Sequence, residues 1–375
     1  MNSGWSIRSF LDVFADVSSG NVKTLQSEYL SQGSYPVVDQ GKTLVGGYVN
    51  DPSRLCNVSL PAIVFGDHTR IFKYIDFPFC MGADGLKVLR PRVDADVRYL
   101  YYYLSSLPLT DGGYDRHFKY LKRADITIPP LPEQRRIAAI LDQADALRAK
   151  RRAALTELET LTQSIFVDMF GDPATNPNTW DELTISDLCK VKGGKRLPKG
   201  EEYSPEPTPF RYIRVTDLQA GWVDESELLY LRPEVQARIS RYTVTAGDVI
   251  ISIAGSIGLI ALVTASISGA NLTENAAKLV PIRDDAYDVV FLSTLLRTPF
   301  VQRQIRSHVG QVTIGKLALF RIEKLCVYLP PIDLQRRFAQ RTQTIQSVLS
   351  VQGSARAHLD ALFASLQHRA FRGEL

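Results

Sequence analysis

The stretch IPPLPEQRRIAAILD, residues 128–142, places three prolines in front of a long run with helical periodicity. Pro132 suits the first turn of a helix, where its missing N–H is not needed. A closely similar stretch, LPPIDLQRRFAQRTQ, occurs at residues 329–343, where Asp333 can cap a second helix. Because the same helix start occurs twice, the sequence predicts a duplicated architecture.

The two stretches are related by a shift of 201 residues, which places Gln134 on Gln335 and continues without a gap through the following helix. Upstream the match is weaker, although LKVLRP at 86–91 resembles AKLVPI at 277–282. We therefore predict two similar units, each with a mixed globular part followed by a long helix.

Both long helices carry apolar residues at alternating steps of three and four, the spacing of a coiled-coil seam. The expected seam residues are Ile137, Ile140, Ala144, Leu147, Ala154, Leu158, Leu161 and Ile165 in the first helix, and Phe338, Ile345, Val348, Ala355, Leu359, Leu362 and Leu366 in the second. Arg151 and Gln352 are polar breaks at equivalent positions and can fix the register. Each helix of about 35 residues would span roughly 50 Å. The alternatives are packing of each helix on its own domain or on the other helix, and the narrow seam favours the second.

The globular parts read as mixed α and β. Strand-like runs alternate with turns rich in Gly, Pro and Asn, and helical runs occur at 95–107 and about 287–306. We predict an α+β fold with a globular domain at 1–131, a long helix at 132–171, a second globular domain at 172–331 and a final helix at 332–375.

The amino-acid composition is typical of a globular protein, and the net charge is slightly positive. The 44 Lys and Arg against 40 Asp and Glu leave a net charge of +4, which permits a polyanionic partner without requiring one. No run reaches the roughly 18 apolar residues of a membrane span, and the first residues lack signal-peptide character, so we expect a cytoplasmic protein. The four cysteines are scattered, which favours free thiols over disulfides or zinc.

The sequence contains stretches that resemble catalytic or metal-binding motifs, but none of them matches such a motif fully. GSYPVVDQGKT at 33–43 has Pro36 where a phosphate loop needs glycine, and DFPF at 76–79 has Phe77 where an amino-methyltransferase motif has proline. The five histidines form no HExxH pattern. We therefore predict that the chain is not an enzyme, with no catalytic residue and no metal.

Loops rich in basic and polar residues are the candidates for nucleic-acid contacts. The predicted DNA-binding residues are Lys42, Thr43, Arg70, Lys73, Arg116 and His117 in the first globular part, and Lys192, Lys195, Arg196, Lys199, Arg211, Arg214, Gln311, Thr313 and Lys316 in the second. Lys and Arg would contact phosphates, while Arg, Gln and Thr can read base edges. Composition alone leaves open that these are ordinary solvated surface charges.

With the duplicated helix start, the two seams and the closing AFRGEL at 370–375, the chain resembles the specificity subunit of Type I restriction–modification systems. Residues 128–172 look like the central conserved region of that family, and 329–375 look like its C-terminal counterpart. The globular parts match only in outline, through GSYPVVDQG, GDVIISIAGSIG and NAAKLVP.

The resemblance implies two target-recognition domains, each reading one half of a bipartite double-stranded DNA target. The two long helices would form an antiparallel coiled-coil spacer with pseudo-twofold symmetry. Two methyltransferase subunits, which bind S-adenosylmethionine, would dock on the helices, and restriction subunits would join them. The chain itself would need no cofactor and no membrane.

Four residues at the helix starts are expected either to begin the helices or to dock a partner. They are Gln134, Arg135, Gln335 and Arg336. The second copy has Asp333 where the first has Pro132, which allows the two partner sites to differ in strength. Two other interpretations remain open. One is a scaffold whose coiled coil joins two protein-binding domains, and the other is a methyltransferase, against which the missing cofactor glycine motif counts.

Overall fold

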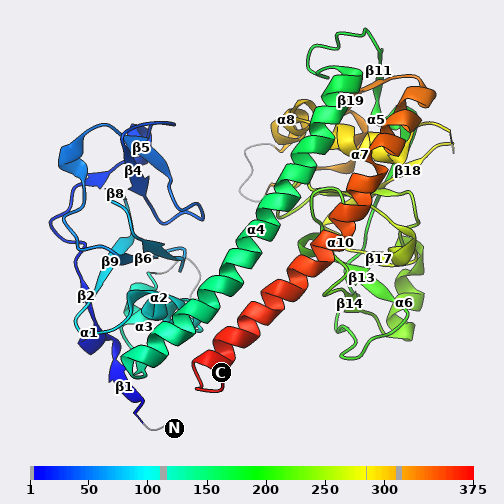
Figure 1. Ribbon diagram of the computed structural model, residues 1–375. Coiled ribbons are helices and arrows are strands. Elements are labelled where there is room, and N and C mark those ends of the chain that lie inside the picture. Colours follow the sequence, from blue (N-terminus) through cyan, green and yellow to red (C-terminus); the bar gives the residue numbers. More distant parts are fainter. Residues whose placement is uncertain (1–3, 110–115, 284, 310–314) are drawn as a thin grey trace. The chain divides into compact units, whose positions relative to one another are not determined.

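The computed structural model describes residues 4–109, 116–283, 285–309 and 315–375 (Figure 1). The chain divides into two compact units. Unit 1 comprises Met1–Arg148 and Leu359–Leu375, and unit 2 comprises Ala149–His358. The long helices are α4 (Leu131–Phe170) and α10 (Ile332–Ala370). Each unit therefore combines one globular domain with the start of one long helix and the end of the other.

The globular domain of unit 1 holds two four-stranded sheets and one two-stranded sheet. The first large sheet has the order β2-β9-β6-β7, the second β3-β8-β4-β5, and β1 pairs with β10. The strands are β1 (Ser6–Ser9), β2 (Phe14–Asp16), β3 (Lys23–Thr24), β4 (Tyr35–Val38), β5 (Gly47–Val49), β6 (Ala62–Gly66), β7 (Phe72–Ile75), β8 (Cys80–Gly82), β9 (Leu86–Pro91) and β10 (Asp125–Ile128). The helices are α1 (Phe10–Val13), α2 (Val97–Ser106) and α3 (Phe118–Leu121).

Unit 2 repeats this topology except that its smaller sheet lacks a counterpart of β3. Its β11 pairs with β19, its four-stranded sheet has the order β12-β18-β15-β16, and a three-stranded sheet has the order β14-β13-β17. The strands are β11 (Asp181–Thr184), β12 (Cys189–Gly193), β13 (Arg211–Ile213), β14 (Leu229–Tyr230), β15 (Val249–Ser252), β16 (Ile260–Leu262), β17 (Asn271–Leu272), β18 (Ala276–Pro281) and β19 (Cys326–Leu329). The helices are α5 (Ile185–Leu188), α6 (Pro233–Ile239), α7 (Val289–Arg297), α8 (Pro299–His308) and α9 (Leu319–Glu323). The internal repeat thus extends through the globular domains, where the sequence match is weak.

Two predicted helical runs can be compared directly with the structure. The run at 95–107 is confirmed as α2. The run at 287–306 is divided into α7 and α8, because Pro299 lacks the N–H that a continuous helix needs and instead opens a new one. In the described part of the chain, no helix has the length and apolar character required to cross a membrane.

A buried glutamine fixes the start of each long helix. The Gln134 side chain donates to the Pro129 carbonyl at 2.7 Å and accepts from the Asp96 backbone N–H at 2.8 Å. Asp96 is also the N-cap of α2, so the start of α4 is joined to the start of α2. We call this arrangement the glutamine clamp.

The second long helix begins with the same clamp. Gln335 donates to the Pro330 carbonyl at 2.7 Å and accepts from the Asp288 N–H at 2.9 Å, and Asp288 caps α7. Gln134 and Gln335 are each only 1% exposed. Both glutamine side chains therefore face their own domain and attach the start of the long helix to it.

The inward stripe on the long helices differs from the predicted seam in part, since Ile137 and Phe338 are buried as predicted. Leu147, Leu161, Val348 and Leu362 were expected inside and are 56%, 48%, 36% and 53% exposed. The inward positions are instead occupied by Arg148 and Thr162 on α4 and by Leu349 and Phe363 on α10, one residue further along in each case.

Polar side chains can occupy those inward positions because their hydrogen-bonding groups are satisfied. Thr162 donates to the Leu158 carbonyl of its own helix at 3.0 Å. In unit 1, Arg148 donates to Asp360 at 2.6 Å and lies over the Phe363 ring. The expected polar breaks Arg151 and Gln352 are half-buried.

The start of one helix lies against the end of the other within each unit. In unit 1, Arg136 of α4 donates to the carbonyl of Leu375, just beyond α10. In unit 2, the Phe338 ring of α10 lies 5.6 Å from Phe166 and 5.5 Å from Phe170 of α4. The pairing seen inside each unit is therefore antiparallel.

We predict that Gln134→Ala and Gln335→Ala each lower the free energy of unfolding by about 1–3 kcal/mol, because each leaves a buried N–H and carbonyl without a partner. Urea denaturation of the full chain measures this change. Gln143→Ala, at an exposed position of α4, is the matched control and should stay within about 0.5 kcal/mol of the parent. An equal loss in all three variants would contradict a role for the clamp.

Candidate nucleic-acid interface

Lys73 was predicted to bind DNA, and the structure corrects this. Its side chain is 5% exposed, and its ammonium donates to the carbonyls of Asp39 and Thr43, both at 2.6 Å. Burial lowers the pKa of Lys73. The residue therefore closes the loop 39–46 between β4 and β5, whereas Lys42 and the Thr43 side chain on that loop are exposed.

His117 is a second correction in unit 1. It is 1% exposed, and its Nδ1 lies 3.0 Å from the Asp67 carbonyl oxygen. The Asp67 carboxylate accepts from the Phe118 N–H at 2.7 Å, so this pair organises the start of α3. Arg116 is exposed, and Arg70 is half-buried with its guanidinium 3.4 Å from the Leu109 carbonyl. Lys42, Thr43 and Arg116 are thus exposed and stay predictions for DNA contact.

Unit 2 contains a small basic cleft with an aromatic wall. The cleft has a volume of about 270 Å³ and is lined by Lys192, Gly193, Arg241, Tyr242, Leu272 and Lys278. The Arg241 guanidinium lies 5.3 Å from the centre of the Tyr242 ring, and the Lys195 ammonium lies 6.0 Å from it. Lys278 is neutralised by Asp248 at 2.8 Å, so Lys192 and Arg241 provide the positive charge of the cleft lining, and Lys195 adds charge beside Tyr242.

Backbone geometry brings the predicted Lys192 and Lys195 to this cleft. Gly194 follows β12 where a Cβ would overlap the carbonyl oxygens of Leu272 and Thr273, so only glycine fits. The next residue, Lys195, donates its N–H to the Leu272 carbonyl at 2.8 Å. These contacts place the loop 194–200 beside the turn that carries Tyr242.

Arg241 and Tyr242 line the cleft but are not among the DNA-binding residues predicted from the sequence. They lie in a short 3₁₀ turn, Ser240–Tyr242, which follows α6. The available signal was a basic residue next to an aromatic one, a pair suited to phosphate contact and ring stacking. It was overlooked because the turn is far from the lysine-rich loop in sequence.

The other arginines of unit 2 that were predicted to bind DNA differ in exposure and in their salt-bridge partners. Arg211 pairs with Glu225 at 3.0 Å, and Arg214 pairs with the buried Asp217 at 2.7 Å. The hydrogen bond with Asp217 raises the pKa of Arg214. Arg196 is 74% exposed although it lies 3.0 Å from Glu274.

Two of the remaining predicted DNA-binding residues lie in the part of the chain that the structure describes, and two do not. Lys199 and Lys316 are exposed, whereas Gln311 and Thr313 lie outside the described residues. At the helix starts, Arg135 and Arg336 are exposed, and Arg336 lies 3.9 Å from Asp333. These residues stay predictions for contacts with DNA or with a partner.

The described residues were compared with the predictions of no metal site and no disulfide. Within them, no group of three or more His, Cys, Asp or Glu side chains could hold a metal ion. All four cysteines are free, as expected from their scattered positions.

The fold and the cleft define a protein built from two copies of one α+β domain, with exposed basic residues on its loops. Residues 2–159 and 177–350 match the family model of the Type I restriction modification DNA specificity domain. The two matches together cover most of the chain and follow the internal repeat. The chain belongs to this family.

Individual relatives agree with this assignment. The chain is 25% identical over 282 residues to the EcoBI specificity subunit of Escherichia coli, covering 67% of this chain and 58% of that subunit. It is 25% identical over 328 residues to the E. coli EcoR124I/EcoR124II specificity subunit, covering 84% and 80%. The chain thus spans little more than half the length of the EcoBI subunit.

A solved structure supports the fold. The crystal structure of the Type I restriction–modification S subunit from M. genitalium matches with a TM-score of 0.55 and 18% identity, over 99% of this chain and 97% of that one. The resemblance and the α+β class predicted from the sequence are confirmed. Membership of the family agrees with the prediction that the chain is not itself an enzyme.

We predict that Lys73→Met lowers the free energy of unfolding by about 1–3 kcal/mol, because it removes the donor to two loop carbonyls. Chemical denaturation and limited proteolysis of the loop 39–46 report this change. Lys42→Met, on the exposed part of the same loop, should leave stability within about 0.5 kcal/mol. Unchanged stability and unchanged cleavage in the Lys73 variant would refute its structural role.

Proposed function

We propose that the chain is the sequence-specific DNA-recognition subunit of a Type I restriction–modification complex, in which each domain reads one half of a bipartite duplex target. The observation that carries this proposal is the basic cleft of unit 2, which Lys192, Arg241 and Tyr242 line, with Lys195 beside the Tyr242 ring. Membership of the DNA specificity family supports the same function.

The cleft has the chemistry needed to hold a nucleic-acid backbone. Lysine and arginine neutralise phosphates and release counterions, which supplies affinity that does not depend on sequence. Base readout then comes from loop side chains placed in register by those contacts. Arg196 and Lys199, exposed on the loop that leaves the cleft, are suited to that task.

The repeated fold suits a target with two halves. The two domains share the strand order of one four-stranded sheet, and each begins its long helix with the same glutamine clamp. In the proposed complex the helices act as the spacer between the two reading domains. The length of the spacer then sets the distance between the two half-sites.

The long helices also offer matched surfaces for a pair of identical partners. Leu147 and Val348 are equivalent in the repeat, as are Leu161 and Leu362, and all four are exposed apolar side chains. Their recurrence at equivalent positions of the repeat is the arrangement that two identical partners would need. We assign them, with Arg135 and Arg336, to two methyltransferase subunits.

The remaining components of the complex follow from this assignment. The methyltransferase subunits would bind S-adenosylmethionine, and this chain would hold no cofactor of its own. Restriction subunits would join the assembly to cleave unmodified DNA. Because its substrate is the genome, the complex would act in the cytoplasm.

The decisive experiment is co-expression of the chain with its methyltransferase partner, followed by methylome sequencing and duplex binding. We expect one bipartite methylated motif and binding that weakens steeply with salt. A complex that binds all duplexes equally would exclude the recognition function. Assembly with protein partners but without any DNA preference would support the scaffold interpretation instead.

We predict that Lys192→Ala, Lys195→Ala and Arg241→Ala each weaken duplex binding to a similar degree on all sequences. Each should also lower the slope of log affinity against log salt by about one. Salt titrations of the full complex measure both effects. Arg283→Ala removes the same charge from an exposed site outside the cleft and is the control. Equal changes in the control would show that overall charge, rather than the cleft, is responsible.

A further inference from the structure

Gly353 lies in the interior of α10, where glycine is less favourable than alanine. Its position is explained by Trp222, because a Cβ at 353 would overlap the indole ring. Gly353 is buried and Trp222 is half-buried. The ring therefore sits in a notch on the helix that only glycine can provide.

The ring is carried by a tight hairpin, residues 218–223, which we call the Trp222 hairpin. Leu218 pairs with Val223, and the Gln219 N–H donates to the Trp222 carbonyl at 2.9 Å. Gly221, with φ +96°, makes the turn and donates to the Ile260 carbonyl at 2.9 Å. The hairpin is thus attached to β16 of its own domain, which limits the movement of the ring.

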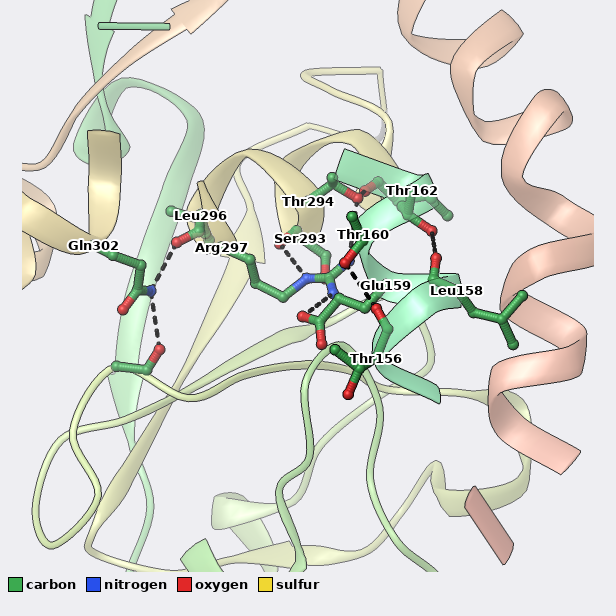
Figure 2. Close-up of polar contacts among 12 residues, drawn as sticks. Thr156, Leu158, Glu159, Thr160, Thr162, Ser293, Thr294, Leu296, Arg297 and Gln302 are labelled. Carbon is green, nitrogen blue, oxygen red and sulfur yellow. Dashed lines mark hydrogen bonds and ion pairs between the residues drawn. The ribbon is translucent and has the colours of Figure 1, made fainter. Parts of the chain in front are cut away.

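Arg297 contacts the turn of the hairpin, and Figure 2 shows its own polar partners. Its side chain is 7% exposed and pairs with Glu159 of α4 at 3.2 Å. It also donates to the Ser293 carbonyl at 3.3 Å. A Cβ on Gly221 would lie 3.1 Å from this guanidinium, so the turn of the hairpin rests directly on it.

The hairpin makes a polar contact with α10 as well. The Arg356 guanidinium donates to the Gln219 side-chain oxygen at 3.1 Å, one helical turn beyond Gly353. Within unit 2, the hairpin consequently contacts α10 through Trp222 and Gln219, and it contacts α4 through Arg297 and Glu159. None of the residues in these contacts lines the basic cleft.

The corresponding loop of unit 1 is organised differently. It is the loop 39–46 between β4 and β5, which Lys73 binds back onto its own domain. The loop between β13 and β14, residues 214–228, is longer and contains the hairpin. The attachment through Trp222 therefore belongs to the second domain.

We propose that Trp222 in the Gly353 notch is a positioning device that holds the second recognition domain at a fixed orientation on α10. The glutamine clamp holds the same domain at Gln335, 18 residues before Gly353. Two anchors roughly 27 Å apart along one helix prevent the domain from pivoting about either of them.

This proposal rests on the DNA-recognition function and adds what sets the accepted half-site spacing. A change of one base pair moves a half-site by about 3.4 Å along the duplex and rotates it by roughly a tenth of a turn. A domain fixed at two points tolerates such a change poorly. Spacing discrimination should therefore depend on Trp222 and Gly353.

The test compares Gly353→Ala, Trp222→Ala and the combined variant in the full complex with the methyltransferase. Methylation is measured on duplexes whose half-sites are separated by the native spacing or by one base pair more or fewer. Val351→Ala, at a position 67% exposed on α10, is the matched control. Tryptophan fluorescence reports whether the ring has left the notch.

We expect each single variant to reduce the preference for the native spacing by about threefold or more, while the control keeps the parental profile. The combined variant should resemble Trp222→Ala alone, because the added methyl group then has no ring to strike. The proposal is overturned if the spacing profile is unchanged, if the two effects multiply, or if methylation falls equally at all spacings. A parental complex without any bipartite preference would instead refute the DNA-recognition function.

Discussion

The buried glutamine at the start of each long helix is the interaction on which the architecture depends. A helix that leaves a globular domain exposes unpaired backbone groups at its first turn, and a preceding proline pair leaves a carbonyl without a local partner. Gln134 and Gln335 each satisfy such a carbonyl and also the N–H of an aspartate that caps a neighbouring helix. One side chain therefore joins two helix starts. Because both of its bonds are buried, the direction of the long helix is coupled to the packing of its domain.

Much of this could be predicted from the sequence because it depends on local spacing. The gapless repeat, both helix starts and α2 follow from residues that are close in the chain. The inward stripe could not be predicted as well, because Arg148 owes its place to Asp360 and Phe363, more than two hundred residues away. Apolar spacing alone favoured Leu147, which is exposed. Sequence periodicity finds the helix reliably, but a polar residue with a distant partner can take the buried position.

The same limit applies to the candidate interface. Lys192 and Lys195 could be identified because they lie in a loop with several basic residues. Lys73 and His117 looked equally suitable, yet their hydrogen-bond partners are backbone carbonyls of their own domain. Arg241 and Tyr242 reach the cleft only through the tertiary fold, in which β17 lies parallel to β13 and carries Leu272 to the same place. Charge in the sequence identifies candidates, and burial decides which of them remain available to a ligand.

Duplication has preserved positions while changing their partners. Glu159 and Asp360 are equivalent in the repeat, and each carboxylate is paired with an arginine. In unit 2 that arginine is Arg297 of α7, so the pair ties the recognition domain to the helix. In unit 1 it is Arg148 of α4, so the pair ties one long helix to the other. The position of α7 that holds Arg297 corresponds in α2 to Ser105, whose hydroxyl donates to the Tyr101 carbonyl of its own helix at 2.8 Å. Equivalent carboxylates of the repeat thus have different roles, because one attaches the second domain to α4 and the other joins α4 to α10 in unit 1.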